Sequence, residues 1–299
     1  MTMHQTRRHF LAQSLTAAGT LTLAPHCLLA DGKQRPELNF LIVTDTHLGY
    51  KDQTTAATLW GQTAAELADA PGSFVLHLGD IVDGGREAMY PLYLEQRKKI
   101  GKPVHEIPGN HDPLPLFEKY IRTPVSTVVD HEWLRVLLLG NARTDSHDGF
   151  LSAEQLGWME QQLKEAQQQD RHAIIAMHVP AHSNRHPDRG WYVHPEEGQK
   201  ELYALLKQYR SRVLALFHGH FHNGIRGWDD NHGLHEVLFP SALYNLDRKL
   251  EQQQAPGYNL AEFRRGYTRV VLTGSQLKLT YCPLGEDPSL SRTLPVEAG

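Results

Sequence analysis

Short apolar runs recur along the chain, and most of them end at a polar residue. Six runs of four to seven residues, between positions 38 and 217, are rich in Val, Ile and Leu and are flanked by turn residues. Runs of this length and composition indicate buried β-strands. The predicted strands are Leu38–Thr44, Phe74–Leu78, Val104–Ile107, Trp133–Leu139, Ala173–Met177 and Val213–Phe217.

Helical patterns lie between several of these runs. They cover Thr54–Ala70, Glu87–Ile100, Ser152–Gln168 and Glu197–Tyr209. The third pattern opens with Ser152 and Gln155 at the spacing of a capping box, and its apolar residues follow one stripe. Strands that alternate with helices predict an α/β sandwich.

The pattern changes after residue 224. The runs Leu234–Phe239, Tyr267–Leu272 and Gln276–Tyr281 resemble strands with little helix between them, so we predict a hairpin-rich second sheet there. We assign the domain to residues 36–283 and a C-terminal tail to residues 284–299.

Polar clusters follow five of the first six strands. In an α/β sheet the carboxyl ends of the strands are where ligands bind, so these clusters would meet if they shared one edge. Each cluster alone has an ordinary explanation as a turn or a cap. Five clusters rich in carboxylate and imidazole groups together favour a metal site. The clusters are Asp45-Thr46-His47, Gly79-Asp80-Ile81-Val82-Asp83, Gly109-Asn110-His111-Asp112, His178-Val179-Pro180 and His218-Gly219-His220-Phe221-His222.

The first thirty residues have the layout of an export signal. Arg7 and Arg8 precede a mildly apolar stretch, and no Asp or Glu occurs before Asp31. Residues 6–11 resemble the bacterial twin-arginine signal, whose pathway exports folded proteins. The alternative is an amphipathic first helix of the domain, which the Gly and Thr residues of the stretch disfavour. We therefore expect a signal over residues 1–30, the twin-arginine export machinery as a partner, and a periplasmic or extracellular location.

Composition and charge exclude several classes of protein. The chain is 40% hydrophobic and 21% charged, as globular domains are. No run of 18 apolar residues occurs, so we expect no transmembrane segment in the mature chain. Residues 1–30 hold two of the 30 basic and none of the 34 acidic residues, so the remainder has a net charge of −6. This charge argues against nucleic acid as the main partner.

The five clusters resemble the motifs of the calcineurin-like metallophosphoesterases. That pattern is D-x-H, G-D-x-x-D, G-N-H-D/E, a single His, and G-H-x-H, and every metal-ligand position is filled here. The resemblance implies a four-layer αββα sandwich, in which two facing mixed β-sheets are flanked by helices. It also implies hydrolysis of phosphate esters through attack by a hydroxide that bridges two metals.

The resemblance implies two divalent transition-metal ions, for which Mn, Zn, Fe or Co suit the mixed nitrogen and oxygen ligands. The implied ligands of the first ion are Asp45, His47, Asp80 and His222, and those of the second are Asp80, Asn110, His178 and His220. By the same resemblance, His111 protonates the leaving oxygen and Asp83 orients His111.

The segment 80–83 (Asp-Ile-Val-Asp) lacks the tyrosine that binds ferric iron in purple acid phosphatases. The sequence is nearer to the bacterial cyclic-nucleotide and glycerophosphodiester phosphodiesterases, so we expect a small phosphodiester substrate. The alternatives are a phosphomonoesterase, a metal-binding protein without catalysis, and a nuclease of the same superfamily. Intact His111 and Asp83 argue against the second, and the net charge argues against the third.

The stretch 180–198 is a long polar loop that follows His178. It carries His182, Arg185 and His186, which would offer positive charge to a phosphate. A solvated surface loop is an equally good interpretation.

Overall fold

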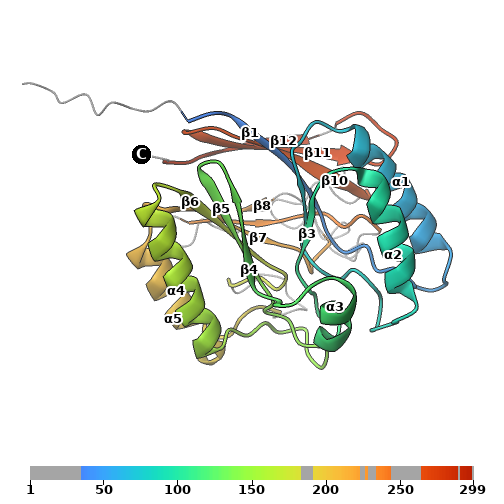
Figure 1. Ribbon diagram of the computed structural model, residues 1–299, viewed down its shortest axis with the longest axis horizontal. Coiled ribbons are helices and arrows are strands. Elements are labelled where there is room, and N and C mark those ends of the chain that lie inside the picture. Colours follow the sequence, from blue (N-terminus) through green and yellow to red (C-terminus); the bar gives the residue numbers. More distant parts are fainter. Residues whose placement is uncertain are drawn as a thin grey trace, which may run out of the picture. The chain divides into compact units, whose positions relative to one another are not determined.

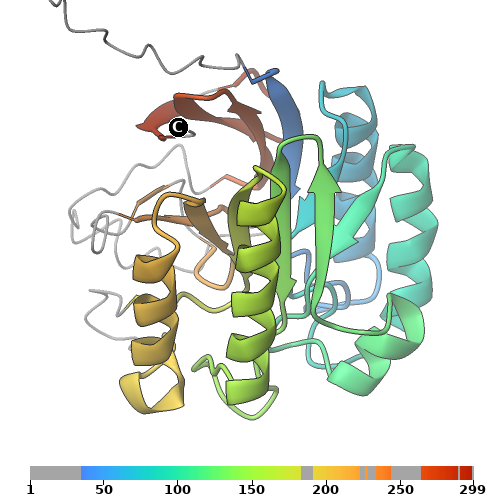
Figure 2. The same ribbon diagram turned by 60° about the vertical axis from the view of Figure 1, so that its left-hand side comes forward.

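The structure, a computed structural model, describes residues 35–182, 191–222, 226–227, 234–243, 264–288 and 290–297. The export signal predicted over residues 1–30 lies outside the described residues. Within the domain that follows it, two six-stranded sheets face each other and helices cover their outer faces, as Figures 1 and 2 show. The predicted α/β four-layer sandwich is therefore confirmed.

The first sheet has the strand order β12-β11-β10-β1-β2-β3. Its strands are β1 (Leu38–Val43), β2 (Val75–His77), β3 (Val104–Glu106), β10 (Gly266–Leu272), β11 (Gln276–Pro283) and β12 (Leu290–Pro295). β1, β2 and β3 run parallel, whereas β10 to β12 form an antiparallel meander that joins β1. The sheet is therefore mixed.

The second sheet has the strand order β4-β5-β6-β7-β9-β8. Its strands are β4 (Thr127–His131), β5 (Leu134–Leu139), β6 (His172–Met177), β7 (Val213–His218), β8 (Arg226–Gly227) and β9 (His235–Leu238). β5, β6, β7 and β9 run parallel, and an antiparallel strand lies at each edge.

The helices cover the outer faces of the sheets. They are α1 (Thr55–Asp69), α2 (Met89–Arg97), α3 (Leu114–Tyr120), α4 (Ala153–Gln168) and α5 (Gln199–Gln208), with short 3-10 turns at Lys98–Ile100 and Pro195–Glu197. α1 and α2 pack on the first sheet, and α4 and α5 pack on the second. None of the helices in the described part of the chain is long and apolar enough to span a membrane.

Alternating residues of β1 show how one strand serves two cores. Phe40 and Ile42 face the second sheet and join the central core, whereas Leu41 and Val43 face α1 and α2. Because side chains of a strand alternate between its faces, a strand that is covered on both sides has a continuous apolar sequence. This explains why the sequence showed runs rather than alternation.

The C-terminal third differs from the prediction. The strands after residue 224 do not build a separate sheet: β9 extends the second sheet beside β7, while β10 and β11 lengthen the first sheet beside β1. The predicted tail, residues 284–299, contains β12, which pairs with β11 along its full length. Hydrophobic runs identify strands, but they do not encode which strand each one pairs with. Neither β4 nor α3 was predicted from the sequence.

The capping box of α4 is present as predicted. Ser152 Oγ accepts a hydrogen bond from Gln155 N at 3.1 Å, and Gln155 Oε1 accepts one from Ser152 N at 3.0 Å. The side chain of Gln155 also donates to the carbonyl oxygen of Gly140, which ties the helix start to the end of β5.

We expect Ser152→Ala to lower the free energy of unfolding by about 1 kcal/mol, because the N3 amide loses its acceptor. Urea denaturation of the purified protein measures this change. Ser152→Thr, which keeps a hydroxyl, should lose less than half as much. Equal stability of Ser152→Ala and the unmodified protein would contradict the assignment of this cap.

Candidate metal centre

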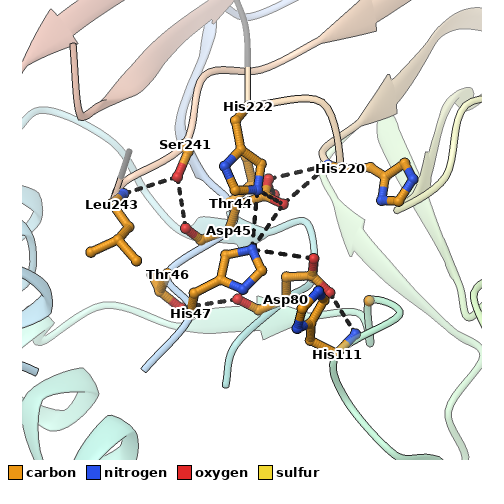
Figure 3. Close-up of polar contacts among 12 residues, drawn as sticks. Thr44, Asp45, Thr46, His47, Asp80, His111, His220, His222, Ser241 and Leu243 are labelled. Atoms are coloured by element: carbon orange, nitrogen blue, oxygen red, sulfur yellow. Dashed lines mark hydrogen bonds and ion pairs between the residues drawn. The ribbon is translucent and has the colours of Figure 1, made fainter. Parts of the chain in front are cut away.

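Seven predicted ligands lie together where the carboxyl ends of five strands meet. Asp45 and His47 follow β1, Asp80 follows β2 and Asn110 follows β3, all in the first sheet. The second sheet contributes the other three, His178 after β6 and His220 and His222 after β7. Figure 3 shows several of these side chains pointing toward one another across the gap between the sheets.

The first group of ligand atoms comes from Asp45, His47, Asp80 and His222, the set predicted for one metal ion. The Nε2 atoms of His47 and His222 are 3.0 Å apart. His222 Nε2 lies 3.0 Å from Asp45 Oδ1, and His47 Nε2 lies 3.3 Å from Asp80 Oδ2. Atoms that bind one ion at about 2.1 Å are themselves about 3 Å apart, so these spacings fit a single ion.

The second group comes from Asp80, His178 and His220, with Asn110 beside them. His178 Nε2 lies 3.2 Å from the same Asp80 Oδ2 that faces His47. Two buried atoms of this group, Asn110 Oδ1 and His220 Nε2, have no hydrogen-bond partner within the described segments. Buried polar atoms without partners are rare and costly, so a cation at this position would satisfy them. The residues therefore fit the implied metal.

Buried charge controls the ionisation of this site. Burial opposes the charge on Asp80, but His178 and His47 outweigh burial and hold the pKa of Asp80 well below its usual range. Burial likewise opposes the charge on His178, whose pKa is nonetheless raised to about 9 by Asp80. Burial and the neighbouring His178 hold the pKa of His220 well below its usual range, so His220 keeps the neutral form that binds metals.

The backbone at the site is held in an unusual conformation. Five of the predicted ligands have positive φ angles: Asp45 (55°), His47 (42°), Asp80 (52°), His220 (71°) and His222 (56°). Residues other than glycine rarely adopt positive φ angles. Each instance costs of order 1–3 kcal/mol, so it persists only where the surrounding structure enforces it. The residues around the site supply that enforcement.

Hydrogen bonds fix the loops in place. Asp45 accepts hydrogen bonds from Thr44 Oγ1 at 2.6 Å and from His220 N at 3.2 Å, while its carbonyl oxygen accepts one from Ser241 Oγ at 2.8 Å (Figure 3). The carboxylate of Asp112 accepts hydrogen bonds from the backbone N–H groups of Ile81, Val82 and Gly109 and from Tyr90 Oη, so it holds the loop after β2 to the loop after β3. Asp112 is therefore a structural residue.

Two further residues, Asp83 and His111, lie beside the ligands. Asp83 Oδ1 lies 3.3 Å from Nδ1 of both His47 and His111. The side chain of His111 is 30% exposed, so it is accessible to a substrate. Gly84 N donates a hydrogen bond to His111 Nδ1 at 3.0 Å. His111 is thus adjacent to the ligand groups, in the place that the sequence assigned to the proton donor.

Beside His111 the surface forms a cavity of about 370 Å³. Asn110 and His111 line it on one side, and residues 144–147 line it on another. His147 stacks on Trp191 with a ring separation of 4.2 Å, and His147 Nδ1 is 3.5 Å from Asn110 Nδ2. His147 belongs to no sequence motif, because this residue reaches the site only through the fold of the 140–150 loop.

The loop after His178 is described in part. His182 N donates to Glu236 Oε1 at 2.9 Å, and the same oxygen accepts a hydrogen bond from Ala181 N. His218 Nε2 lies 3.1 Å from this buried carboxylate, so Glu236 joins β9, the end of β7 and the start of the loop. Arg185 and His186, also predicted to contact substrate, lie outside the described residues.

Comparison with known proteins gives the family. The model for the calcineurin-like phosphoesterase family matches residues 38–224, the part of the chain that carries every predicted ligand. The chain belongs to the calcineurin-like phosphoesterases. It is therefore a metal-dependent hydrolase of phosphoesters.

The chain is also similar to individual proteins, two in sequence and one in fold. The chain is 26% identical to the 3',5'-cyclic adenosine monophosphate phosphodiesterase CpdA of Haemophilus influenzae over 64% of this chain and 72% of that protein. It is 32% identical to the probable glycerophosphodiester phosphodiesterase GpdQ of Arcobacter nitrofigilis over 50% of this chain and 56% of that protein. The fold is similar to that of a dimetal phosphatase from Danio rerio, with a TM-score of 0.64, 14% identity, and coverage of 88% of this chain and 100% of that chain.

Gly219, which follows β7, lies close against Thr44 and Asp45, which follow β1. A Cβ atom at this position would overlap Thr44 Oγ1 and would lie 2.8 Å from Asp45 Oδ2. We expect Gly219→Ala to lower the free energy of unfolding by about 1–3 kcal/mol, as overpacking does, and to weaken metal binding as His220 moves. Thermal unfolding and the metal content after dialysis measure the two effects.

Gly157→Ala is the matched control. Gly157 is exposed within α4, and no atom lies within 4 Å of a Cβ built there. This variant should gain about 0.5–1 kcal/mol of stability, because alanine favours a helix interior more than glycine does. If Gly219→Ala were as stable and as metal-rich as the unmodified protein, the close approach of the sheets would not constrain the site.

Proposed function

We propose that this protein is an exported phosphodiesterase that uses two divalent transition-metal ions. The observation that carries the proposal is the position of Asp80 Oδ2. This one oxygen lies 3.3 Å from His47 Nε2 in the first ligand group and 3.2 Å from His178 Nε2 in the second. A carboxylate between two adjacent dications offsets their repulsion, so the geometry supports a pair of ions that share Asp80.

The metal ions, when bound, supply a hydroxide at near-neutral pH and neutralise charge on the phosphoryl oxygens. The ligands provide both nitrogen and oxygen atoms, which suit Mn, Zn, Fe or Co. The protein holds these ligands on two sheets, so it does not need to rearrange them during turnover.

His111 completes the reaction on the side of the leaving group. Its Nδ1 lies 3.0 Å from Gly84 N on the backbone side, which leaves Nε2 as the ring nitrogen for the substrate. The protonated, imidazolium form of His111 would donate its Nε2 proton to the departing alcohol oxygen and become neutral. The cavity beside His111 gives that alcohol a place to lie.

A diester substrate is supported by the relatives. The proteins from Haemophilus influenzae and Arcobacter nitrofigilis are both named as phosphodiesterases, although for different diesters. We propose that the residues around the cavity, including His147, contact the group that leaves. His182, Arg185 and His186 stay candidates for phosphate contact.

Hydrolysis of model substrates tests this proposal. The metal-free protein is reconstituted with Mn, Zn, Co or Fe and assayed with bis(p-nitrophenyl) phosphate and p-nitrophenyl phosphate. We expect a higher kcat/KM for the diester with at least one metal. His111→Ala should keep its metal and lose about 10²–10⁴-fold in turnover, with the larger loss for poor leaving groups, because these need the proton most.

Asp80→Asn is the comparison variant, and it should lose metal and activity together. Absence of hydrolysis with every metal would sink the proposed function. Preference for the monoester would instead identify a phosphatase. Loss of metal from His111→Ala would show that His111 is a ligand and not the proton donor.

Export is tested by the two arginines of the signal. Replacing both Arg7 and Arg8 by lysine keeps the positive charge but removes the arginine pair that the twin-arginine pathway reads. We expect the doubly substituted protein to remain in the cytoplasm, as measured by fractionation and immunoblotting. An unchanged periplasmic fraction would reject the twin-arginine route.

A further inference from the structure

Two aromatic side chains lie between the candidate ligands and the cavity. His147 stacks on Trp191, with ring centroids 4.2 Å apart and an angle of 24° between the ring planes. The rings of Trp191 and His147 lie 5.3 Å and 5.8 Å, respectively, from the ring of the predicted ligand His220. Because His147 also lines the cavity, the stack begins at the ligand group and ends at the cavity wall.

The main chain holds the two stacked residues in register. Gly149 and Val193 form a parallel β-bridge, and Gly149 N donates a hydrogen bond to the carbonyl oxygen of Tyr192 at 3.2 Å. A Cβ atom at Gly149 would lie 2.8 Å from Val193 Cγ2, so the two segments pack closely without a side chain between them. Residues 147–149 and 191–193 are therefore held together as one unit.

His147 is exposed, yet its ring is held in place. Half-buried Trp191 covers one face of the imidazole, and Asn110 Nδ2 lies 3.5 Å from its Nδ1. A side chain that is restrained before a ligand binds loses little conformational entropy on binding. The ring of His147 is thus a preorganised part of the cavity wall, and its exposed surface is available to a ligand.

The other residues of the cavity indicate what it accepts. A Cβ atom at Gly84 would have no atom within 4 Å, so the cavity is open on that side. Among the described residues that line it there is no lysine or arginine, and Asp145 adds a negative charge, which disfavours a second anionic group. Asn110 and His111 line the end nearest the ligands, so an uncharged group joined to the phosphoryl group would extend into the cavity.

We propose that His147 binds a flat, uncharged ring of the substrate by stacking, and that Trp191 is the positioning residue that holds His147 for this contact. Aromatic side chains, histidine included, stack on planar rings such as nucleobases. A puckered ring of the same size buries apolar surface but does not stack. The inference rests on the proposed function for the place of the phosphate, and it narrows the substrate to diesters in which one alcohol carries a planar ring.

Two ligands that cannot be hydrolysed test the stack directly. Benzylphosphonate and cyclohexylmethylphosphonate carry the same charged group and rings of equal size, but only the first ring is flat. Isothermal titration calorimetry of the full-length, Mn²⁺-loaded protein gives the Kd of each. We expect benzylphosphonate to bind about two- to tenfold more tightly, which is the gain that stacking adds to apolar burial. His147→Ala should bind the two ligands equally and keep its metal.

A double-mutant cycle tests whether Trp191 acts through His147. Trp191→Ala should lose most of the preference for benzylphosphonate, because the ring of His147 is no longer held. The double variant should lose no more of this preference than His147→Ala alone. Trp191→Phe keeps an aromatic ring beneath His147 and should restore most of the preference. The metal content should be the same in all of these variants.

Tyr192→Ala is the matched control. Tyr192 follows Trp191 in the same segment, but its ring packs on His194, with centroids 4.2 Å apart. Its removal takes an aromatic ring from this segment and keeps the carbonyl oxygen that accepts from Gly149 N. The preference for benzylphosphonate should therefore stay as it is in the unmodified protein.

The proposal is overturned if the unmodified protein binds both phosphonates equally, if His147→Ala keeps the preference, or if the losses of the two single variants add. Loss of metal from Trp191→Ala would also overturn it, because Trp191 would then support the ligand His220 rather than His147. If the protein prefers benzylphosphonate but hydrolyses no phosphoester, the proposed function fails while the stacking site is upheld.

Discussion

Uncompensated charge at the junction of the two sheets is the constraint on which the rest of the structure depends. Asp45 is fully buried and Asp80 is 2% exposed, so their charges cannot be stabilised by water. Burying isolated carboxylates would cost far more than a small domain can spare. The surrounding imidazoles and backbone N–H groups offset part of this cost, and Asn110 Oδ1 and His220 Nε2, which have no hydrogen-bond partner among the described residues, point to a cation that offsets the remainder.

The architecture supplies what such a site needs. In each sheet the parallel strands end at the same edge. Gly219 has no side chain, so the edge of the second sheet can lie directly against Thr44 and Asp45 of the first. The ligands lie on tight loops with positive φ angles, which would be unfavourable in isolation. Apolar cores on both faces of each sheet stabilise the strands and so hold those loops in their strained form. The free energy gained by packing the cores thus offsets the cost of the strained loops at the site.

The sequence predicted this framework well, for a physical reason. A strand buried on both faces must be apolar throughout, so the chemistry-bearing residues can only begin where the strand ends, and the boundary is visible in the sequence. Pairing is different, because the position of β10 beside β1 is set by contacts between residues more than 200 positions apart. The sequence also does not distinguish a histidine that binds metal from one that packs beneath the site. His77 is as buried as His178, but burial lowers its pKa to about 3 and it contacts Thr46 and Gly79 beneath the site.

His147 lines the cavity beside the ligands although it belongs to no sequence motif. Residues of this kind bear on which substrate the protein accepts. The ligands fall within residues 38–224, the region shared with the whole family. Two relatives at 26% and 32% identity are named for different diesters, so membership of the family does not by itself decide the substrate. Under the proposed function, the choice comes from residues outside the ligand set. In the part of the chain that the structure describes, the loop 144–147 lines the cavity beside His111, and His147 stacks on Trp191. Loops of this kind vary without disturbing the sheets, so one rigid metal framework is compatible with many substrates.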